Sequence, residues 1–60
     1  MDERYYKLPE LAKTVGLSVR HLQREIDRRE LVAYKFGRAV RVSEKDAESY
    51  IERHRRERAG

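Results

Sequence analysis

The chain has 60 residues and contains no cysteine. Disulfides and thiolate metal sites are therefore excluded, which fits a reducing cytoplasm. No apolar run approaches the ~20 residues that a helix needs to cross a bilayer. Residues 1–4 have neither an apolar core nor a small-residue cleavage site, so they do not resemble a signal peptide. We therefore expect a soluble intracellular protein with no membrane partner.

Groups that could support catalysis or bind a cofactor are also scarce. The two histidines, His21 and His54, lie far apart, and neither belongs to a ligand motif with cysteine or a second histidine. No nucleophile stands with a base, and no glycine-rich loop could cradle a phosphate. We expect Glu25, Asp27 and Glu30 to pair with neighbouring arginines and not to form an acid–base pair. The sequence thus predicts no metal, no cofactor and no enzymatic activity.

Charged residues make up 43% of the chain, and hydrophobic residues make up 38%. A chain this short holds one domain and buries only about 60% of the surface that it exposes when unfolded. Its apolar residues nevertheless fall in helical and strand registers, which indicates a folded chain. We expect a single domain over residues 1–60 with an ordered core at about 5–54. The tail from about Arg55 is expected to fray because it has no apolar anchor.

Positive charge is concentrated in the middle of the chain. The net charge is +4, from 15 basic and 11 acidic residues. Residues 1–17 hold three of each sign and residues 42–60 hold five of each, so both segments are neutral. Residues 18–41 hold seven basic and three acidic residues, and the whole excess falls there. A local basic field of this kind indicates a polyanionic partner.

Two helices separated by a tight turn are predicted in the first half of the chain. Apolar residues repeat at i, i+3, i+4 and i+7 over residues 8–15, with a proline in the first turn and Gly16 at the end. Ser18 is a good N-cap for a second helix. Its buried stripe is expected to be Val19, Leu22 and Ile26, and its opposite side Arg20, Gln23, Arg24 and Asp27. Two helices joined by such a short turn with glycine form a helix-turn-helix.

A β-hairpin is predicted next. Residues 32–36 and 39–42 are rich in β-branched or aromatic residues, and Gly37 opens a two-residue turn, which favours type II′. Lys35 then faces Val40. The residues expected to contact the helices are Ala33, Val40 and Val42. The opposite face is expected to hold Tyr34, Phe36, Ala39 and Arg41, partly covered by Tyr5 and Tyr6.

A last helix is predicted after Ser43, with Asp46 three residues on in a weak capping-box pattern. Its buried face is expected to be Ala47, Tyr50, Ile51 and His54. Acidic residues cluster early and arginines late, which complements the helix dipole. The basic residues at 53–58 could form a solvated helix end, an extra phosphate contact or a docking surface, and the sequence does not rank the last two.

The order helix, tight turn, helix, hairpin, helix predicts a mainly α fold with a β-hairpin, the winged helix-turn-helix. The start of its second helix meets base edges in the major groove, where arginine can bond guanine and glutamine can bond adenine. The hairpin tip can reach the backbone or the minor groove, and the helix N-terminus at Ser18 can hold a phosphate. We therefore predict binding to double-stranded DNA. The predicted DNA-binding residues are Ser18, Val19, Arg20, His21, Gln23, Arg24, Lys35, Arg38 and Arg41.

Four stretches resemble the excisionase-type winged-helix domains of the MerR-like superfamily. Residues 11–20 are similar to the family's A-x-x-x-G-[VL]-S-x-R start, and residues 29–38 to its G-E-L-P-A-x-R-I-G-R hairpin. Residues 40–43 stand where the family usually has W-R-I-P, and residues 46–51 resemble its D-L-E-A-Y-L closing helix. The resemblance covers roughly residues 5–52, in order and with the family's spacing.

Three residues depart from the family's pattern, which loosens the assignment to a subfamily and leaves the expected fold unchanged. Arg29 replaces a glycine after the second helix, which leaves open whether a left-handed C-cap forms there. Val32 replaces a proline. Val40 replaces a tryptophan, which leaves a smaller core.

The resemblance implies a phage or integrative-element excisionase, also called a recombination directionality factor, in the cytoplasm of a bacterial host cell. Such proteins bind attachment-site DNA, often in tandem copies that allow cooperative self-assembly, bend it, and direct an integrase toward excision. On that interpretation Arg20, Gln23 and Arg24 read bases, while Arg38 and Arg41 hold the wing to the backbone or the minor groove. Two alternatives stay open: a small prophage-type transcriptional regulator on the same fold, and a protein-interaction module that binds no DNA.

Overall fold

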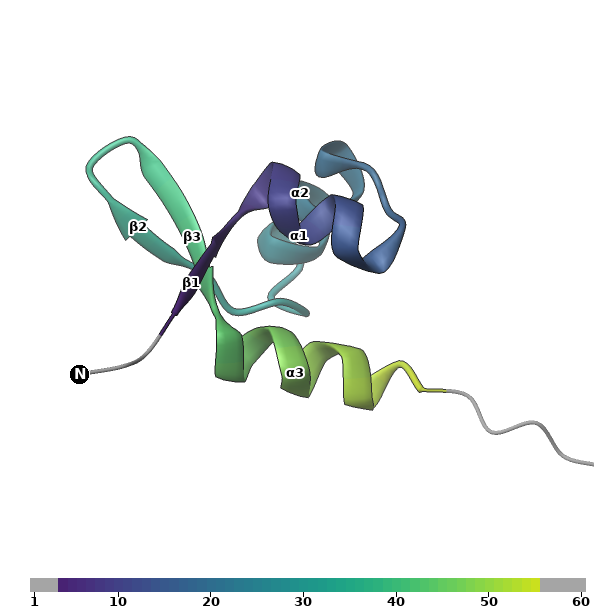
Figure 1. The fold of residues 1–60 in the computed structure, drawn as a ribbon. Helices are drawn as coiled ribbons and strands as arrows, with labels where there is room; N and C mark the ends of the chain where they lie inside the picture. The colour runs from purple at the N-terminus through teal and green to yellow at the C-terminus, as the bar shows by residue number, and fades with distance from the viewer. Residues whose placement is uncertain (1–3, 56–60) are drawn as a thin grey trace, which may run out of the picture.

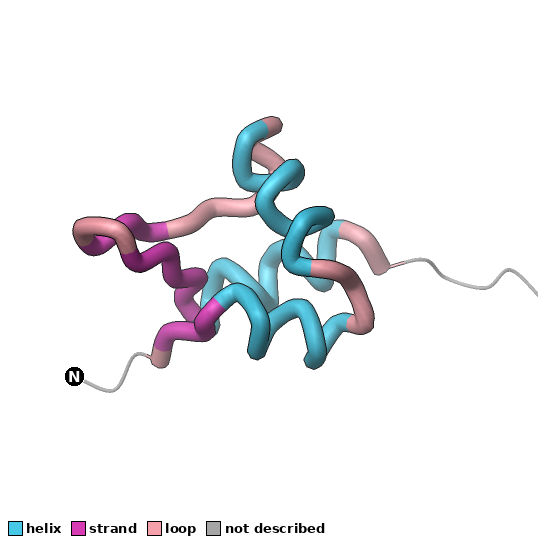
Figure 2. The backbone as a smooth tube through the Cα atoms, turned by 90° about the horizontal axis from the view of Figure 1, so that it is seen from above, coloured by secondary structure: helices cyan, strands magenta, loops and turns pink. Residues whose placement is uncertain are grey.

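Three helices and a three-stranded antiparallel sheet form the protein, here a computed structural model in which residues 4–55 are described. The elements in chain order are β1 (Tyr5–Lys7), α1 (Leu8–Val15), α2 (Val19–Asp27), β2 (Tyr34–Phe36), β3 (Ala39–Ser43) and α3 (Glu44–Arg53) (Figure 1). The hairpin of β2 and β3 projects away from the helices (Figure 2). The predicted fold class, a mainly helical winged helix-turn-helix, is confirmed. The tail that was expected to fray lies, after Arg55, outside the described residues.

The turn between α1 and α2 forms as its residue types predict. Gly16 ends α1 in a left-handed conformation with φ 75°, which an L side chain disfavours. The next backbone N–H, that of Leu17, donates to the Ala12 carbonyl at 2.9 Å. The Ser18 hydroxyl then accepts a hydrogen bond from the His21 N–H at 3.0 Å and caps α2. Local hydrogen bonds therefore set the angle at which α2 leaves α1.

The sheet has the strand order β1-β3-β2, so the predicted hairpin gains a third strand from the start of the chain. The hairpin has the predicted register, with Lys35 opposite Val40. Gly37 has a φ of 64° and the residue after it does not have a positive φ, which is the pattern of a type II′ turn. Strand β1 was not predicted, because three residues are too few to show an alternating pattern.

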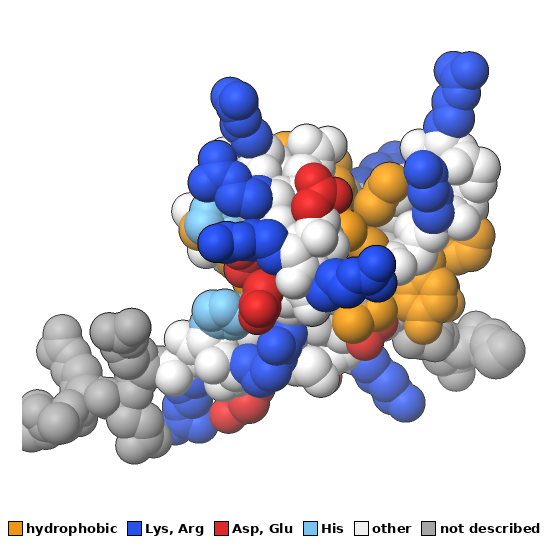
Figure 3. Space-filling model, turned by 180° about the vertical axis from the view of Figure 1, so that it is seen from behind, with side chains coloured by type: hydrophobic (Ala, Val, Ile, Leu, Met, Phe, Trp, Pro, Cys, Tyr) orange, Lys and Arg blue, Asp and Glu red, His pale blue; other side chains and the backbone are white. Residues whose placement is uncertain are grey.

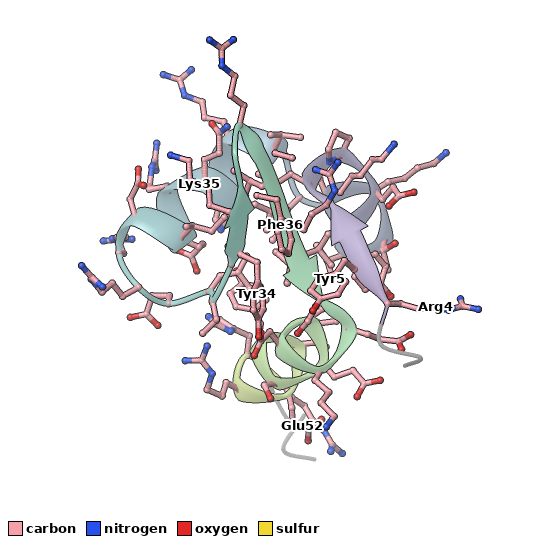
Figure 4. The ribbon with its side chains drawn as sticks, turned by 90° about the vertical axis from the view of Figure 1, so that its left-hand side faces the viewer. Arg4, Tyr5, Tyr34, Lys35, Phe36 and Glu52 are labelled. Atoms are coloured by element: carbon pink, nitrogen blue, oxygen red, sulfur yellow. The ribbon has the colours of Figure 1, made fainter. Side chains whose placement is uncertain are left out.

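Aromatic rings cover the outer face of the sheet, which is turned away from the helices (Figure 4). The Tyr5 ring meets Tyr34 and Phe36 edge to face, with centroid separations of 5.4 and 5.8 Å. The expectation that Tyr5 covers this face is confirmed, and the same expectation for Tyr6 is wrong. Tyr6 packs against the core instead, because successive side chains of a strand point to opposite faces.

The core lies between the inner face of the sheet and the three helices. Its buried apolar members are Leu8, Leu11, Ala12, Leu22, Leu31, Val42, Ala47 and Tyr50. Half-buried side chains packed against them include Ala33 and Val40 of the hairpin and Val19 and Ile26 of α2. The predicted inner face of the hairpin and the predicted buried stripe of α2 are therefore confirmed.

Helix α3 follows β3 without a loop. The predicted N-cap is confirmed, since the Ser43 hydroxyl accepts a hydrogen bond from the Asp46 N–H at 3.0 Å and donates one to its carboxylate at 2.8 Å. The prediction that Ile51 and His54 are buried is wrong, because the Ile51 side chain is 45% exposed and His54 is exposed too. The buried residues of α3 are Ala47 and Tyr50, so the stripe that meets the core is narrower than the apolar pattern. None of the helices among residues 4–55 has the length and apolar character needed to cross a membrane.

Helix α2 ends in a left-handed turn at Arg29, whose φ is 64°. The Arg29 N–H donates to the Ile26 carbonyl at 3.0 Å, and the Glu30 N–H donates to the Glu25 carbonyl at 2.8 Å. These bonds satisfy carbonyl groups that the end of a helix leaves free. The left-handed cap that the sequence left open is thus present, although a non-glycine residue in this conformation costs about 1–2 kcal/mol.

Candidate nucleic-acid interface

Helix α2 turns an apolar side to the core and a polar side to solvent. Leu22 is completely buried, and its apolar neighbours on the helix pack against the core. Residues three and four apart share one side of a helix, so the outward stripe consists of Arg20, Gln23, Arg24 and Asp27, all exposed. Lys and Arg side chains gather over the helical part and over the hairpin on the face that Figure 3 shows. The structure therefore brings the three predicted base-reading residues of α2 together.

The start of α2 holds three further predicted site residues in different surroundings. Ser18 lies at the N-cap, where several backbone N–H groups have no partner within the helix. The Val19 side chain packs against the core, which leaves its backbone N–H as the group that could meet a phosphate. His21 is exposed and also lines a hollow between α1, α2 and α3. His21 therefore flanks the outward stripe and does not belong to it.

The hairpin brings a second basic group close to α2. Lys35 lines an open hollow of about 450 Å³ together with Gln23 and Asp27. Figure 4 shows Lys35 on the side of β2 that faces α2, away from the aromatic rings. Arg38 lies in the exposed turn at the hairpin tip. Lys35 thus lies beside the outward stripe of α2, whereas Arg38 lies at the tip of the hairpin.

Arg41 is placed differently from the other predicted wing residues. It lies opposite Tyr34 in the register, on the aromatic outer face of the sheet. Its guanidinium Nη1 donates to the Val40 carbonyl at 2.9 Å, and its side chain is half-buried. The structure therefore does not bring Arg41 into the hollow that holds Lys35.

A buried carboxylate links α2 to α3. Glu25 is only 8% exposed, and its Oε1 accepts a hydrogen bond from the Tyr50 hydroxyl at 3.0 Å. Burial, followed by this hydrogen bond and by the charge of Glu25, raises the pKa of Tyr50 above its ordinary value of 10.0. Arg28 and His54 each have a nitrogen 3.9 Å from the Glu25 carboxylate. This inward direction of Glu25 was not predicted, although its position three residues after the buried Leu22 indicates it.

The other two acidic residues of the basic segment differ from each other. The Glu30 carboxylate lies 3.8 Å from Arg53 of α3, which also donates to the Glu30 carbonyl. Asp27 forms no ion pair with any residue in the described range 4–55. Pairing with arginines is thus confirmed for Glu25 and Glu30 and is wrong for Asp27. On the outward side of α2, arginines and glutamine stand with one unpaired carboxylate.

No group of three or more histidine, aspartate or glutamate side chains within residues 4–55 could hold a metal ion. The arrangement instead offers positively charged hydrogen-bond donors on α2 and on the hairpin, two elements that together line one open hollow. Donors of this kind bind phosphate oxygens and base edges.

Comparison with known protein families agrees with this arrangement. The model of a family described as a helix-turn-helix domain, a DNA-binding family, matches residues 5–55. This span contains every helix and strand described above. No curated protein and no solved structure matches the chain.

Proposed function

The chain belongs to the helix-turn-helix domain family, and we propose that it binds double-stranded DNA sequence-specifically through α2 and the hairpin. The observation that carries the proposal is the outward stripe of α2, whose arginines are exposed, while Glu25 and Glu30 are held by groups of α3. In helix-turn-helix docking, the start of such a helix lies against base edges in the major groove. Nothing in this mechanism requires a covalent step, because binding supplies the whole effect.

The proposed contacts divide by chemistry. Arg20, Gln23 and Arg24 carry donors that match guanine and adenine edges, so they would read bases. The start of α2, with Ser18, Val19 and His21, would hold a backbone phosphate through N–H groups and the dipole. The proposed wing contacts with the backbone or the minor groove are Lys35, Arg38 and Arg41, of which Arg41 would need DNA that wraps around the hairpin.

A salt titration tests DNA binding. About four to six phosphate contacts predict that the logarithm of the binding constant falls against the logarithm of salt concentration with a slope of about −4 to −5. The measurement is an electrophoretic mobility shift with a random duplex and with a duplex selected by the protein. A flat response, or no shift at low salt, would remove DNA binding and would leave a protein-interaction module.

We further propose that the DNA-binding domain acts as a phage or integrative-element excisionase, which bends attachment-site DNA and directs an integrase toward excision. The resemblance over residues 5–52 supports this role. The left-handed backbone at Arg29 supports it too, because this is the position at which the excisionase-type pattern has glycine. Added phosphate contacts along the wing and the start of α2 would offset the free energy that bending the DNA costs.

Footprinting on attachment-site DNA separates the excisionase from a transcriptional regulator on the same fold. An excisionase should protect several direct repeats cooperatively, and circular-permutation mobility assays should show a bend. A single palindromic site at a promoter, without bending, would contradict the excisionase and favour the regulator. Recombination assays with the cognate integrase should then show more excision product when the protein is added.

A further inference from the structure

Asp27 is the one acidic residue of the basic segment that the fold leaves without an ion pair among residues 4–55. Glu25 and Glu30, the other two acidic residues of that segment, are held by groups of α3. Asp27 instead is exposed at the end of the outward stripe of α2, one helical turn after Gln23 and Arg24. A carboxylate in this place repels the phosphates that the neighbouring arginines attract.

Stability of the fold does not explain this carboxylate. Asp27 is the last residue of α2, where the helix dipole disfavours a negative charge. The free N–H groups that stabilise acidic residues lie in the first turn of a helix, so Asp27 cannot accept hydrogen bonds from them. Replacing Asp27 by a neutral side chain should therefore leave the fold intact or make it slightly more stable.

The surroundings of Asp27 indicate what its carboxylate could accept. Asp27 lines the open hollow between α2 and the wing, where Gln23 and Lys35 provide donors. A carboxylate offers acceptors only. Among the groups on the floor of the major groove, the amino groups of cytosine and adenine are donors, and on adenine the adjacent N7 is an acceptor that a carboxylate would meet with repulsion.

We propose that Asp27 is a specificity-determining residue that accepts a hydrogen bond from the N4 amino group of a cytosine and weakens binding to sites without one. The assignment deepens the proposed DNA binding and rests on it. Lys35, across the same hollow, would hold the adjacent phosphate. Asp27 would thus lower the affinity for DNA in general and increase the discrimination at one base pair.

The test uses sites selected by the wild-type protein from a random duplex library. Wild type should require cytosine at one position, and replacing that base pair should lower its affinity about fivefold or more, the usual discrimination of a side chain that reads a base. Asp27→Ala should bind a random duplex more tightly than wild type and should lose this preference. Asp27→Asn should move the preference toward adenine, because an amide matches the adenine N6 and N7 pair.

Glu48→Gln is the matched control, since it removes one negative charge from the exposed surface of α3. It should keep the cytosine preference, which separates base reading from net charge. An unchanged preference in both Asp27 variants would overturn the proposal. So would an equal loss of affinity for every duplex, because that result would make Asp27 a residue that only positions the wing. Failure of wild type to bind any duplex would instead refute the DNA-binding function itself.

Discussion

The two sides of α2 carry the same kinds of charged residue and differ in whether the fold provides partners for them. Toward α3, Glu25 and Tyr50 form a buried hydrogen bond, and Glu30 pairs with Arg53. On the outward side, Arg20 and Arg24 form no ion pair with any residue described. Charges with partners hold two helices together, whereas charges without partners are available to an external anion. The presence or absence of a partner therefore distinguishes structural residues from binding residues. Charge alone does not distinguish them, because charged residues occur on both sides of the helix.

Removing the unpaired arginines should have the largest effect. Each lost base contact costs about 1–3 kcal/mol, so Arg20→Ala/Arg24→Ala should lower the affinity for the selected duplex about thirtyfold or more. The free energy of unfolding should change by less than about 0.5 kcal/mol, because both side chains are exposed. Mobility shifts and urea denaturation measure the two quantities. An equal loss on selected and random duplexes would reassign the arginines to phosphate contacts.

Lys45→Ala controls this experiment, because it removes an exposed positive charge from α3. It should weaken binding far less than the arginine pair does. The control and the double variant could instead lose the same affinity for each positive charge removed. The outward stripe would then have no special role in binding, and the two sides of α2 would not differ in function.

Removing a contact between α2 and α3 should lower the stability of the fold and leave the affinity for DNA unchanged. Tyr50→Phe removes the hydroxyl that donates to the buried Glu25 carboxylate, and an unsatisfied buried acceptor costs about 1–3 kcal/mol. Urea denaturation should show this loss, while the affinity of the folded protein for DNA stays within about twofold of wild type. Tyr34→Phe is the control, since the Tyr34 side chain is 41% exposed on the outer face. A binding defect in Tyr50→Phe larger than its stability defect would contradict the division of roles.

A substitution at the left-handed residue that ends α2 should stabilise the fold, by less than Tyr50→Phe destabilises it. Arg29→Gly relieves a left-handed conformation with φ 64°, and the gain should exceed the entropic cost of glycine by about 0.5–1 kcal/mol. Arg28→Gly is the control, because it removes the same charge at a φ of −85° and should destabilise. Thermal and urea denaturation compare the two. If both substitutions destabilised equally, strain at Arg29 would not contribute to the stability of the fold.

Features that depend on neighbours in the sequence could be predicted. The Gly16 turn, the Ser18 and Ser43 caps and the hairpin register all follow from residue types within a few positions of one another. The outward stripe of α2 follows from helical periodicity and needs no knowledge of the other elements. This is why most of the candidate site on α2 could be identified before the fold was known.

Features that depend on distant segments could not be predicted. Strand β1 exists because β3 offers a free edge, and its three residues contain no signal of their own. Helical spacing indicates the inward direction of Glu25, but it does not show that Tyr50, twenty-five positions later, supplies the donor for its carboxylate. Ile51 is exposed because α3 meets the core along a narrow stripe, and periodicity gives the direction of a helix face but not its width.

The pH dependence of stability should give the smallest effect and isolates the Glu25–Tyr50 contact from the rest of the paired side. Because the pKa of Tyr50 is raised in the folded state, the neutral hydroxyl is favoured by folding. Its contribution is fully present below the ordinary value of 10.0 and is lost as pH rises through the raised folded value. The difference in unfolding free energy between wild type and Tyr50→Phe should therefore be constant at about neutral pH and shrink above about pH 10. All other side chains are common to the two proteins, so the difference between them removes their contribution. A difference that stayed constant to high pH would mean that Tyr50 ionises as readily in the folded chain as in the unfolded one, and that the hydroxyl does not stabilise the buried carboxylate of α2.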